Sequence, residues 1–331
     1  HCHDHHTALI PFMMQHCVEY RNKLSKTASV LTIHNAQYQG WMSWNKSHYI
    51  PNYDSWKKGL LEWNNLINPL ACGIKCAWKV TTVSHSYMKE LSWNSNGLEQ
   101  LFEYEKGKCS GILNGIDTEV WNPQTDSFLN SHYNTKSVVV GKQRTKEELC
   151  EKFNLDVHQP LIVFIGRLVG EKAADILPDV FLNCLNGLKE KVCFLILGSG
   201  DKQIEWQLKE MNNKYKKYYH AQIGYDEALS HTMYAGADFL LMPSRVEPCG
   251  LNQMYAMRYG TIPMVRSTGG LQDTVIDMGE ENGYGIRFNN ATVEDVFNAV
   301  KRAVTVFEDI KKVLEMRRLM MNIDNSWENA V

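Results

Sequence analysis

The chain has 331 residues, of which 44% are hydrophobic and 22% are charged, and its formal net charge at pH 7 is -2. This length suits a soluble globular protein of two domains, and the small net charge argues against a binder of nucleic acid or of an anionic membrane. The longest apolar runs, 161–165 and 192–197, are far too short to span a bilayer. The nine cysteines are scattered and form no CxxC pair, which is typical of reduced thiols in a cytoplasmic enzyme.

The first part of the chain has an irregular pattern. Residues 7–24 predict a helix despite Pro11, and the apolar runs 30–33 and 80–83 predict buried strands on either side of an aromatic, polar insertion. Seven of the nine tryptophans lie in this half, and we expect packing to explain most of them. The chain starts on what reads as the end of a strand and supplies few strands for a full sheet. We therefore expect this domain to be incomplete at its N-terminus.

The polar stretch 123–143 is expected to join two domains, residues 1–135 and 136–331. The second domain alternates apolar and amphipathic runs, which is typical of a parallel sheet with helices on both faces, a Rossmann-like α/β domain. The expected strands are 160–166, 192–198, 221–224, 238–242 and 261–266. The expected helices are 176–188, 203–216, 227–235, 253–259 and 293–307.

The most informative segment of this domain is 244–251, with the sequence SRVEPCGL, which follows the fourth strand and precedes a helix. In an open parallel sheet, ligands bind at the carboxyl ends of the strands. Glu247 is suited to be a general acid or base, a nucleophile or a carboxylate that binds a hydroxyl group. A solvated salt bridge between Glu247 and Arg245 explains the residue about equally well.

Other strand-to-helix loops of the second domain predict a site for a diphosphate. Thr268, Gly269 and Gly270 open a helix, and backbone N–H groups at a helix N-terminus attract anions. Arg167 and Lys172, after the first strand, can bring two cations to the same anion and stabilise its departure from a sugar without a metal. The glycines alone fit an ordinary capped turn, but the combination favours a phosphate. Tyr225 can stack on a nucleobase, although a single loop tyrosine is more often a packing residue.

Two motifs of the first domain carry polar groups that suit a sugar or a metal. The N-terminal HCHDHH run could supply metal ligands, but no distant Cys or His set completes a site, so we expect no metal. Asp4 is expected to cap the following helix instead. The run 34–40, HNAQYQG, follows a strand and is rich in amide groups beside Trp41 and Trp44, which suits sugar recognition. Asn114-Gly115 fits a type I′ turn.

Taken in order, these motifs resemble the bacterial and plant type of starch or glycogen synthase. The strings are HCHDHHTALIP, HNAQYQG, ILNGIDTEVWNP, GRL-x-x-EK, IGYDEALSH, PSRVEPCGLNQ and TGGLQDTV. The resemblance implies a GT-B fold of two facing Rossmann-like domains, the first on the acceptor side and the second binding the nucleotide sugar. It also implies transfer of glucose, usually from ADP-glucose, to the non-reducing end of an α-1,4-glucan with retention of configuration, with no cofactor.

The resemblance assigns roles to individual residues. Arg167 and Lys172 are expected to bind the diphosphate, Tyr225 to stack on the base, and Glu247 to hold the donor glucose. His3 is expected near the reacting centre, in a front-face mechanism in which the leaving phosphate helps to deprotonate the acceptor. The remaining donor contacts are expected from Asn114, Cys249, Gly250, Leu251, Thr268, Gly269 and Gly270. The acceptor side is expected to use His34, Asn35, Gln37 and Tyr38.

The chain departs from the family pattern at three places. The N-terminal KTGGL motif, which supplies a lysine to the nucleotide site, is not present, and this puts the activity of the chain in doubt. Tyr255 stands where the wider retaining superfamily often has a second glutamate, and Ala173 stands where a glycine is common. Two alternatives are therefore kept. One is a glucan-binding fragment without turnover, and the other is a glucan phosphorylase-like enzyme, for which no lysine in a matching context for pyridoxal phosphate is found.

Overall fold

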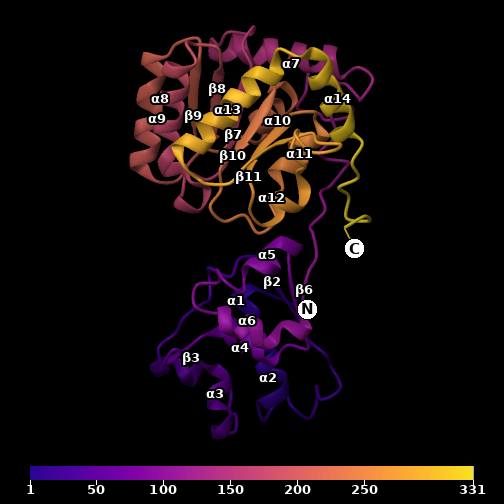
Figure 1. Cartoon of the computed structure of the whole chain (residues 1–331). Coiled ribbons are helices and arrows are strands. Elements are labelled where there is room, and N and C mark those ends of the chain that lie inside the picture. Colours follow the sequence, from indigo (N-terminus) through magenta and orange to yellow (C-terminus); the bar gives the residue numbers. More distant parts are fainter. Residues whose placement is uncertain (331) are drawn as a thin grey trace. The chain divides into compact units, whose positions relative to one another are not determined.

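The computed structural model describes residues 1–330. The chain divides into two compact units, His1–Asn114 and Gly115–Val331 (Figure 1). The expected domain boundary at 135/136 stays a prediction. The segment between the two positions packs with the second unit, since the buried Tyr133 hydroxyl donates to the carbonyl oxygens of Ala235 and Tyr259 at 3.1 and 2.8 Å. Within the described residues, no helix is both long and apolar enough to cross a membrane.

The first unit is built on a four-stranded parallel sheet with the order β1-β2-β5-β6. Its strands are β1 (Cys2–His3), β2 (Val30–Ile33), β5 (Lys79–Thr82) and β6 (Cys109–Gly111). The main helices are α1 (Asp4–Thr7), α2 (Ile10–His16), α4 (Pro69–Cys76), α5 (His85–Glu90) and α6 (Glu99–Glu105). The insertion contains α3 (Lys58–Leu61) and the hairpin of β3 (Glu62–Trp63) and β4 (Leu66–Ile67). Strands 30–33 and 80–83 are thus confirmed, while β6 was not predicted.

Two expectations for this unit are wrong. The helix predicted over 7–24 is interrupted after α1 and ends at His16, because Pro11 lies in the first turn of α2 and Cys17 adopts an extended conformation. Packing does not explain most of the tryptophans of the chain's first half. Four of the seven are exposed, namely Trp41, Trp56, Trp78 and Trp93.

The second unit is built on a six-stranded parallel sheet with the order β12-β11-β10-β7-β8-β9. Its strands are β7 (Leu161–Ile165), β8 (Cys193–Gly198), β9 (Tyr219–Ile223), β10 (Phe239–Met242), β11 (Ile262–Arg266) and β12 (Ile286–Phe288). Alternate residues of β7 and β8 belong to two different apolar cores, because successive side chains point to opposite faces of the sheet. The expected doubly covered sheet is confirmed, with β12 as an additional edge strand.

Helices cover both faces of this sheet. The predicted helices are present as α8 (Leu177–Gly187), α9 (Lys202–Lys214), α10 (Glu227–Gly236), α11 (Asn252–Arg258) and α13 (Val293–Phe307). The structure adds α7 (Val138–Phe153), α12 (Gly269–Thr274) and α14 (Ile310–Met321). One face packs mainly against α8, α9 and α13, and the other against α7, α10 and α11. The polar linker predicted over 123–143 is therefore too long, since its last six residues start α7 and Val138, Gly141 and Lys142 are buried there.

Candidate active site

The carboxyl ends of β7 and β10 enclose a small cavity of about 200 Å³ that brings together three predicted charged side chains and the predicted Leu251. Arg167, Lys172 and Glu247 line it, with Asn252 from the start of α11. The Lys172 ammonium group lies 2.6 Å from Oε2 of Glu247, and the Ser244 hydroxyl donates to the same oxygen at 2.8 Å. The prediction that loops distant in sequence converge at this edge is confirmed for these side chains.

Glu247 is 6% exposed, so its carboxylate is held in a dry environment by one cation and one hydroxyl group. Both donors contact Oε2, whereas Oε1 has no hydrogen-bond partner within residues 1–330. Such partners offset the cost of burying a carboxylate. Oε1 is therefore the atom of this group that is available to a bound hydroxyl.

Arg245 does not pair with Glu247, and the alternative of a solvated Glu247–Arg245 salt bridge is wrong. The Arg245 guanidinium instead contacts both carboxylate oxygens of Asp175, at 2.5 and 2.8 Å, and donates to the Gly170 carbonyl at 2.8 Å. Backbone N–H groups of Arg245 and Val246 also donate to the Glu171 carbonyl. Arg245 thus fastens the loop that carries Lys172 to the loop that carries Glu247, which fixes the distance between these two side chains.

A second cavity, of about 340 Å³, lies next to the first and shares Ile165, Gly166, Arg167 and Asn252 with it. Tyr225 lines this cavity and is 86% exposed, so its ring is free of core packing. The Asn252 amide donates to the carbonyl of Ile165 at 2.8 Å, which holds the start of α11 against the end of β7 between the two cavities. The two cavities therefore lie side by side at this sheet edge, and together they are called the groove.

The inner wall of the second cavity is an aromatic stack that the sequence analysis missed. Trp121 lies between His231 and Tyr255, with ring centroids 4.0 and 3.8 Å away and interplanar angles of 12° and 15°. His231 is itself held by Asp126 at 2.7 Å. Burial by itself raises the pKa of Asp126, but hydrogen bonds from His231 and Tyr259 outweigh it and the net pKa is lowered. Trp121 belongs to the ILNGIDTEVWNP motif, and this motif was the sequence feature from which a role for Trp121 could have been predicted.

The glycines at the start of α12, which were predicted to cradle a diphosphate, have a packing role in the structure. The Gly270 N–H already donates to the carbonyls of Glu247 and Pro248, both at 3.1 Å. A Cβ at Gly269 would lie 2.0 Å from the Glu247 carbonyl oxygen, and one at Gly270 would lie 2.1 Å from that of Cys249. These residues let α12 pack directly onto the turn that carries Glu247. A donor-binding role for them, for Thr268 and for Cys249, Gly250 and Leu251 stays a prediction, and Leu251 lines the smaller cavity.

In the first unit, the predicted histidines gather where β1 and β2 end. Nδ1 of His3 lies 3.0 Å from Nε2 of His34, and both side chains are exposed. Asp4 does not cap a helix with its side chain, because its Oδ1 accepts the backbone N–H groups of His34 at 2.7 Å and Asn35 at 3.4 Å. It therefore ties the two strand ends together. Within the described part of the chain, no group of three His, Cys, Asp or Glu residues is arranged to hold a metal.

The remaining predicted residues of this unit lie on the loop that follows β2 or, for Asn114, at the end of the unit. The Asn35 side chain accepts the backbone N–H of Gln37 at 3.0 Å, and Tyr38 is about half exposed. Asn114 is the last residue of the unit. The type I′ turn at 114–115 is wrong, because neither residue has the positive φ that this turn requires. Gly115 is needed for another reason, since a Cβ there would lie 2.4 Å from the Trp327 nitrogen.

Comparison with known proteins adds two family matches. Residues 1–104 match the starch synthase catalytic domain family, and residues 145–308 match the glycosyl transferases group 1 family. A glycogen synthase of Flavobacterium johnsoniae is 52% identical over 329 residues, covering 99% of this chain and 69% of the relative. A glycogen synthase of Thermodesulfovibrio yellowstonii is 39% identical, covering 100% of this chain and 66% of the relative.

Solved structures give the same result for the fold. The catalytic domain of starch synthase IV from Arabidopsis thaliana, bound to ADP and acarbose, matches with a TM-score of 0.88 and 32% identity, over 99% of this chain and 70% of that one. HepE from Anabaena, in complex with UDP, matches with a TM-score of 0.61 at 14% identity, over 98% of this chain and 73% of that one. The fold class predicted from the sequence, the α/β GT-B class with parallel sheets, is confirmed.

Proposed function

Because the chain belongs to the starch and glycogen synthase family of glycosyltransferases, with glucosyl transfer from a nucleotide-glucose as its activity, we propose that its donor is ADP-glucose and its acceptor the non-reducing end of an α-1,4-glucan. The observation that carries this proposal is the Glu247–Lys172 ion pair in the cavity that Arg167 also lines. The ADP bound by the plant starch synthase at 32% identity supports ADP as the nucleotide. All nine cysteines are free thiols, which supports a cytoplasmic location.

In this proposal, the donor lies along the groove at the carboxyl edge of the second unit. The base stacks on Tyr225, the diphosphate lies against Arg167 and Lys172, and the glucose hydroxyls reach Oε1 of Glu247. The two cations neutralise the charge that develops on the departing diphosphate, as preorganised groups do in a site shielded from water. His3, with its hydrogen bond to His34, is assigned to the reacting centre, and Asn35, Gln37 and Tyr38 to the acceptor side. Retention follows from the front-face route, in which the leaving phosphate takes the acceptor proton.

The choice of donor is tested by comparing turnover and protection. We expect ADP release from ADP-glucose, with a glucan primer, to exceed UDP release from UDP-glucose. We also expect ADP to raise the unfolding temperature more than UDP at equal concentration, since a ligand that binds only the folded state stabilises it. Faster turnover of UDP-glucose would overturn the assignment of the base. Glucan binding without release of either nucleotide would favour the alternative of a binding fragment.

The base-stacking role of Tyr225 gives a second prediction. Tyr225→Ala should weaken ADP binding by roughly three- to tenfold, because an aromatic contact contributes about 0.5–1.5 kcal/mol beyond its buried area. Calorimetric titration with ADP measures this effect. Tyr104→Ala is a matched control, since Tyr104 is 84% exposed in the first unit and Tyr225 is 86% exposed. Equal ADP affinity in the two variants would remove Tyr225 from the donor site.

A further inference from the structure

A cavity larger than either of the two that line the proposed donor groove lies away from that groove, at the opposite edge of the same sheet. It has a volume of about 610 Å³, which is within the usual range for small-molecule sites. Pro160 and Asp238 line it just before β7 and β10 begin, and Lys191 lines it just before β8. Its other walls come from α7, the end of α13 and α14. The whole cavity belongs to the second unit.

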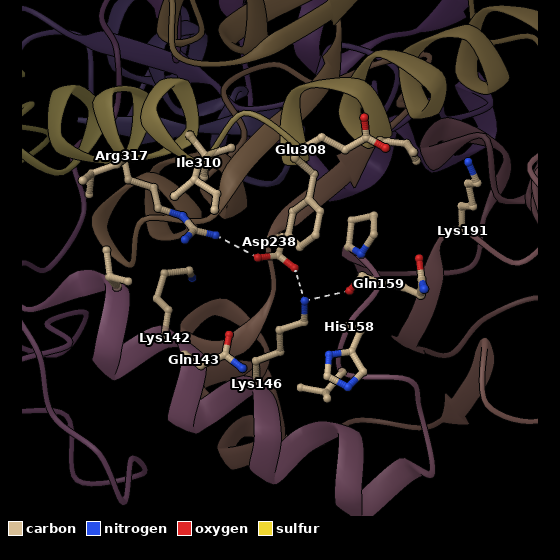
Figure 2. Close-up of a pocket in the computed structure, with 17 residues that line it drawn as sticks. Lys142, Gln143, Lys146, His158, Gln159, Lys191, Asp238, Glu308, Ile310 and Arg317 are labelled. Carbon is tan, nitrogen blue, oxygen red and sulfur yellow. Dashed lines mark hydrogen bonds and ion pairs between the residues drawn. The ribbon is translucent and has the colours of Figure 1, made fainter.

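The floor of the cavity is a buried ion triad with more positive than negative charge. The two oxygens of Asp238 contact Nη2 of Arg317 at 2.8 Å and Nζ of Lys146 at 2.7 Å (Figure 2). The oxygen that contacts Lys146 also accepts the backbone N–H of Leu161 at 2.9 Å. The Lys146 ammonium group also donates to the Gln159 carbonyl at 2.7 Å. Both carboxylate oxygens of Asp238 thus have hydrogen-bond partners. With two cations and one anion, the triad has one excess positive charge. Nε of Arg317 is buried and has no hydrogen-bond partner among residues 1–330.

The remaining lining combines apolar walls with a second cationic group. The apolar residues are Val139, Val157, Pro160, Val304, Phe307, Ile310, Val313 and Leu314. Lys191 is exposed and its ammonium group has no hydrogen-bond or ion-pair partner among residues 1–330. Glu308 is the only lining carboxylate besides Asp238. Lys142 adds little, because its ammonium group points to the carbonyls of Tyr234, Ala235 and Tyr259.

We propose that this cavity is a binding site for a small organic anion, a carboxylate or phosphate ester with a ring or a short hydrocarbon body. The anionic group lies between the Lys146–Asp238–Arg317 triad and Lys191, where a positive charge is in excess. Attraction between charges is stronger there than at an open surface, because the apolar walls exclude water. The ring or hydrocarbon body lies against Phe307, Val304 and Pro160. The opposite sheet edge binds the sugar nucleotide, so the two ligands do not compete.

Phenyl phosphate is a suitable probe, since it combines a ring with an anionic group. Isothermal titration of the full chain should give saturable binding with a Kd of roughly 1 mM, which is typical of so small a ligand. Phenol and inorganic phosphate, each with half of the recognised chemistry, should bind at least about tenfold more weakly. Equal binding of inorganic phosphate would show that the apolar walls contribute nothing and would overturn the proposal.

Three variants locate the binding. Lys191→Glu should weaken phenyl phosphate binding by about tenfold or more, because it places a like charge beside the anion. Lys301→Glu, which reverses an exposed lysine of α13 that does not line the cavity, should leave binding unchanged. Leu314→Trp fills the cavity and should abolish binding, with circular dichroism as a check of the fold.

Phenyl phosphate could also meet the cations of the donor groove, and Lys172→Ala separates the two sites. Binding in the cavity should persist in Lys172→Ala and be lost in Lys191→Glu. The reverse pattern would place the probe in the donor groove and overturn the proposal. Should Leu314→Trp fail to fold, the opposite responses of Lys191→Glu and Lys172→Ala still decide the question.

Discussion

Glu247→Gln should lower the rate of glucosyl transfer by about 10²- to 10³-fold, the cost of losing one preorganised electrostatic contact in an active site. The substitution keeps the shape of the side chain but removes the charge that holds Lys172 at 2.6 Å. In the proposed site it also removes the charge that Oε1 presents to the donor hydroxyls. Lys172 then loses the one ion-pair partner that it has among residues 1–330, and with it the contact that holds it toward the proposed diphosphate position. The rate is measured as ADP released from ADP-glucose in the presence of a glucan primer.

The matched control is Glu294→Gln, an exposed carboxylate in the first turn of α13. It should leave the rate unchanged. ADP affinity measures the part of the loss that comes through Lys172, because ADP has a diphosphate but no glucose to contact Glu247. A Glu247→Gln variant that keeps most of its rate, with a normal unfolding temperature, would show that this carboxylate does not take part in the reaction.

Asp238→Asn should destabilise the second unit by about 3–5 kcal/mol, the usual cost of leaving a buried charge without its partner. The carboxylate lies between Lys146 and Arg317, and the side chains of all three residues are almost fully buried. Asparagine has nearly the same shape, so the loss reports charge and hydrogen bonding and not a cavity. Urea unfolding followed by circular dichroism measures the difference in free energy. Asp175→Asn is the control, because the Arg245–Asp175 pair is about half exposed and should contribute about 1 kcal/mol or less.

The parent protein and Asp238→Asn should also differ in the way their stability responds to acid. Burial by itself raises the pKa of Asp238, but Lys146 and Arg317 outweigh burial and the net pKa is lowered. A carboxylate with a lowered folded-state pKa stabilises the fold fully above its unfolded pKa, which is about 3.9. The stability difference between the parent and Asp238→Asn should therefore be constant from about pH 5 to 8 and shrink as the pH falls below about 4. A difference that grows in acid would contradict this account of the triad.

The second unit was predictable from sequence because its strands are short apolar runs and its helices are amphipathic. Residues 161–164 and 193–198 are buried on both faces, and this pattern has few other interpretations. The convergence of Arg167, Lys172 and Glu247 followed from topology alone, since the loops after parallel strands share one edge. Helix α7 was not predicted because its sequence is largely polar. Its buried Lys142 and Lys146 are expected at the surface unless their carbonyl and carboxylate partners are known.

Side-chain pairing could not be predicted in the same way. Arg245 lies two residues from Glu247, yet its partner is Asp175, seventy residues away in the sequence. The Trp121 stack also joins residues from three separate segments. In the first unit, Pro11 and the insertion divide the pattern into pieces too short for a period to be recognised. Local sequence fixes the loops of this protein, whereas the partners within them depend on the packed tertiary structure.

The close approach of α12 to the turn at 247–249 has a consequence for motion. With backbone carbonyl oxygens only 2.0 and 2.1 Å from where the Cβ atoms of Gly269 and Gly270 would be, no larger side chain fits without displacing main chain. We therefore expect α12 and the turn at 247–249 to move as one rigid unit, without a hinge between them. If the proposed donor groove changes shape when a ligand binds, we expect the movement in other segments, such as the loop of the 86% exposed Tyr225.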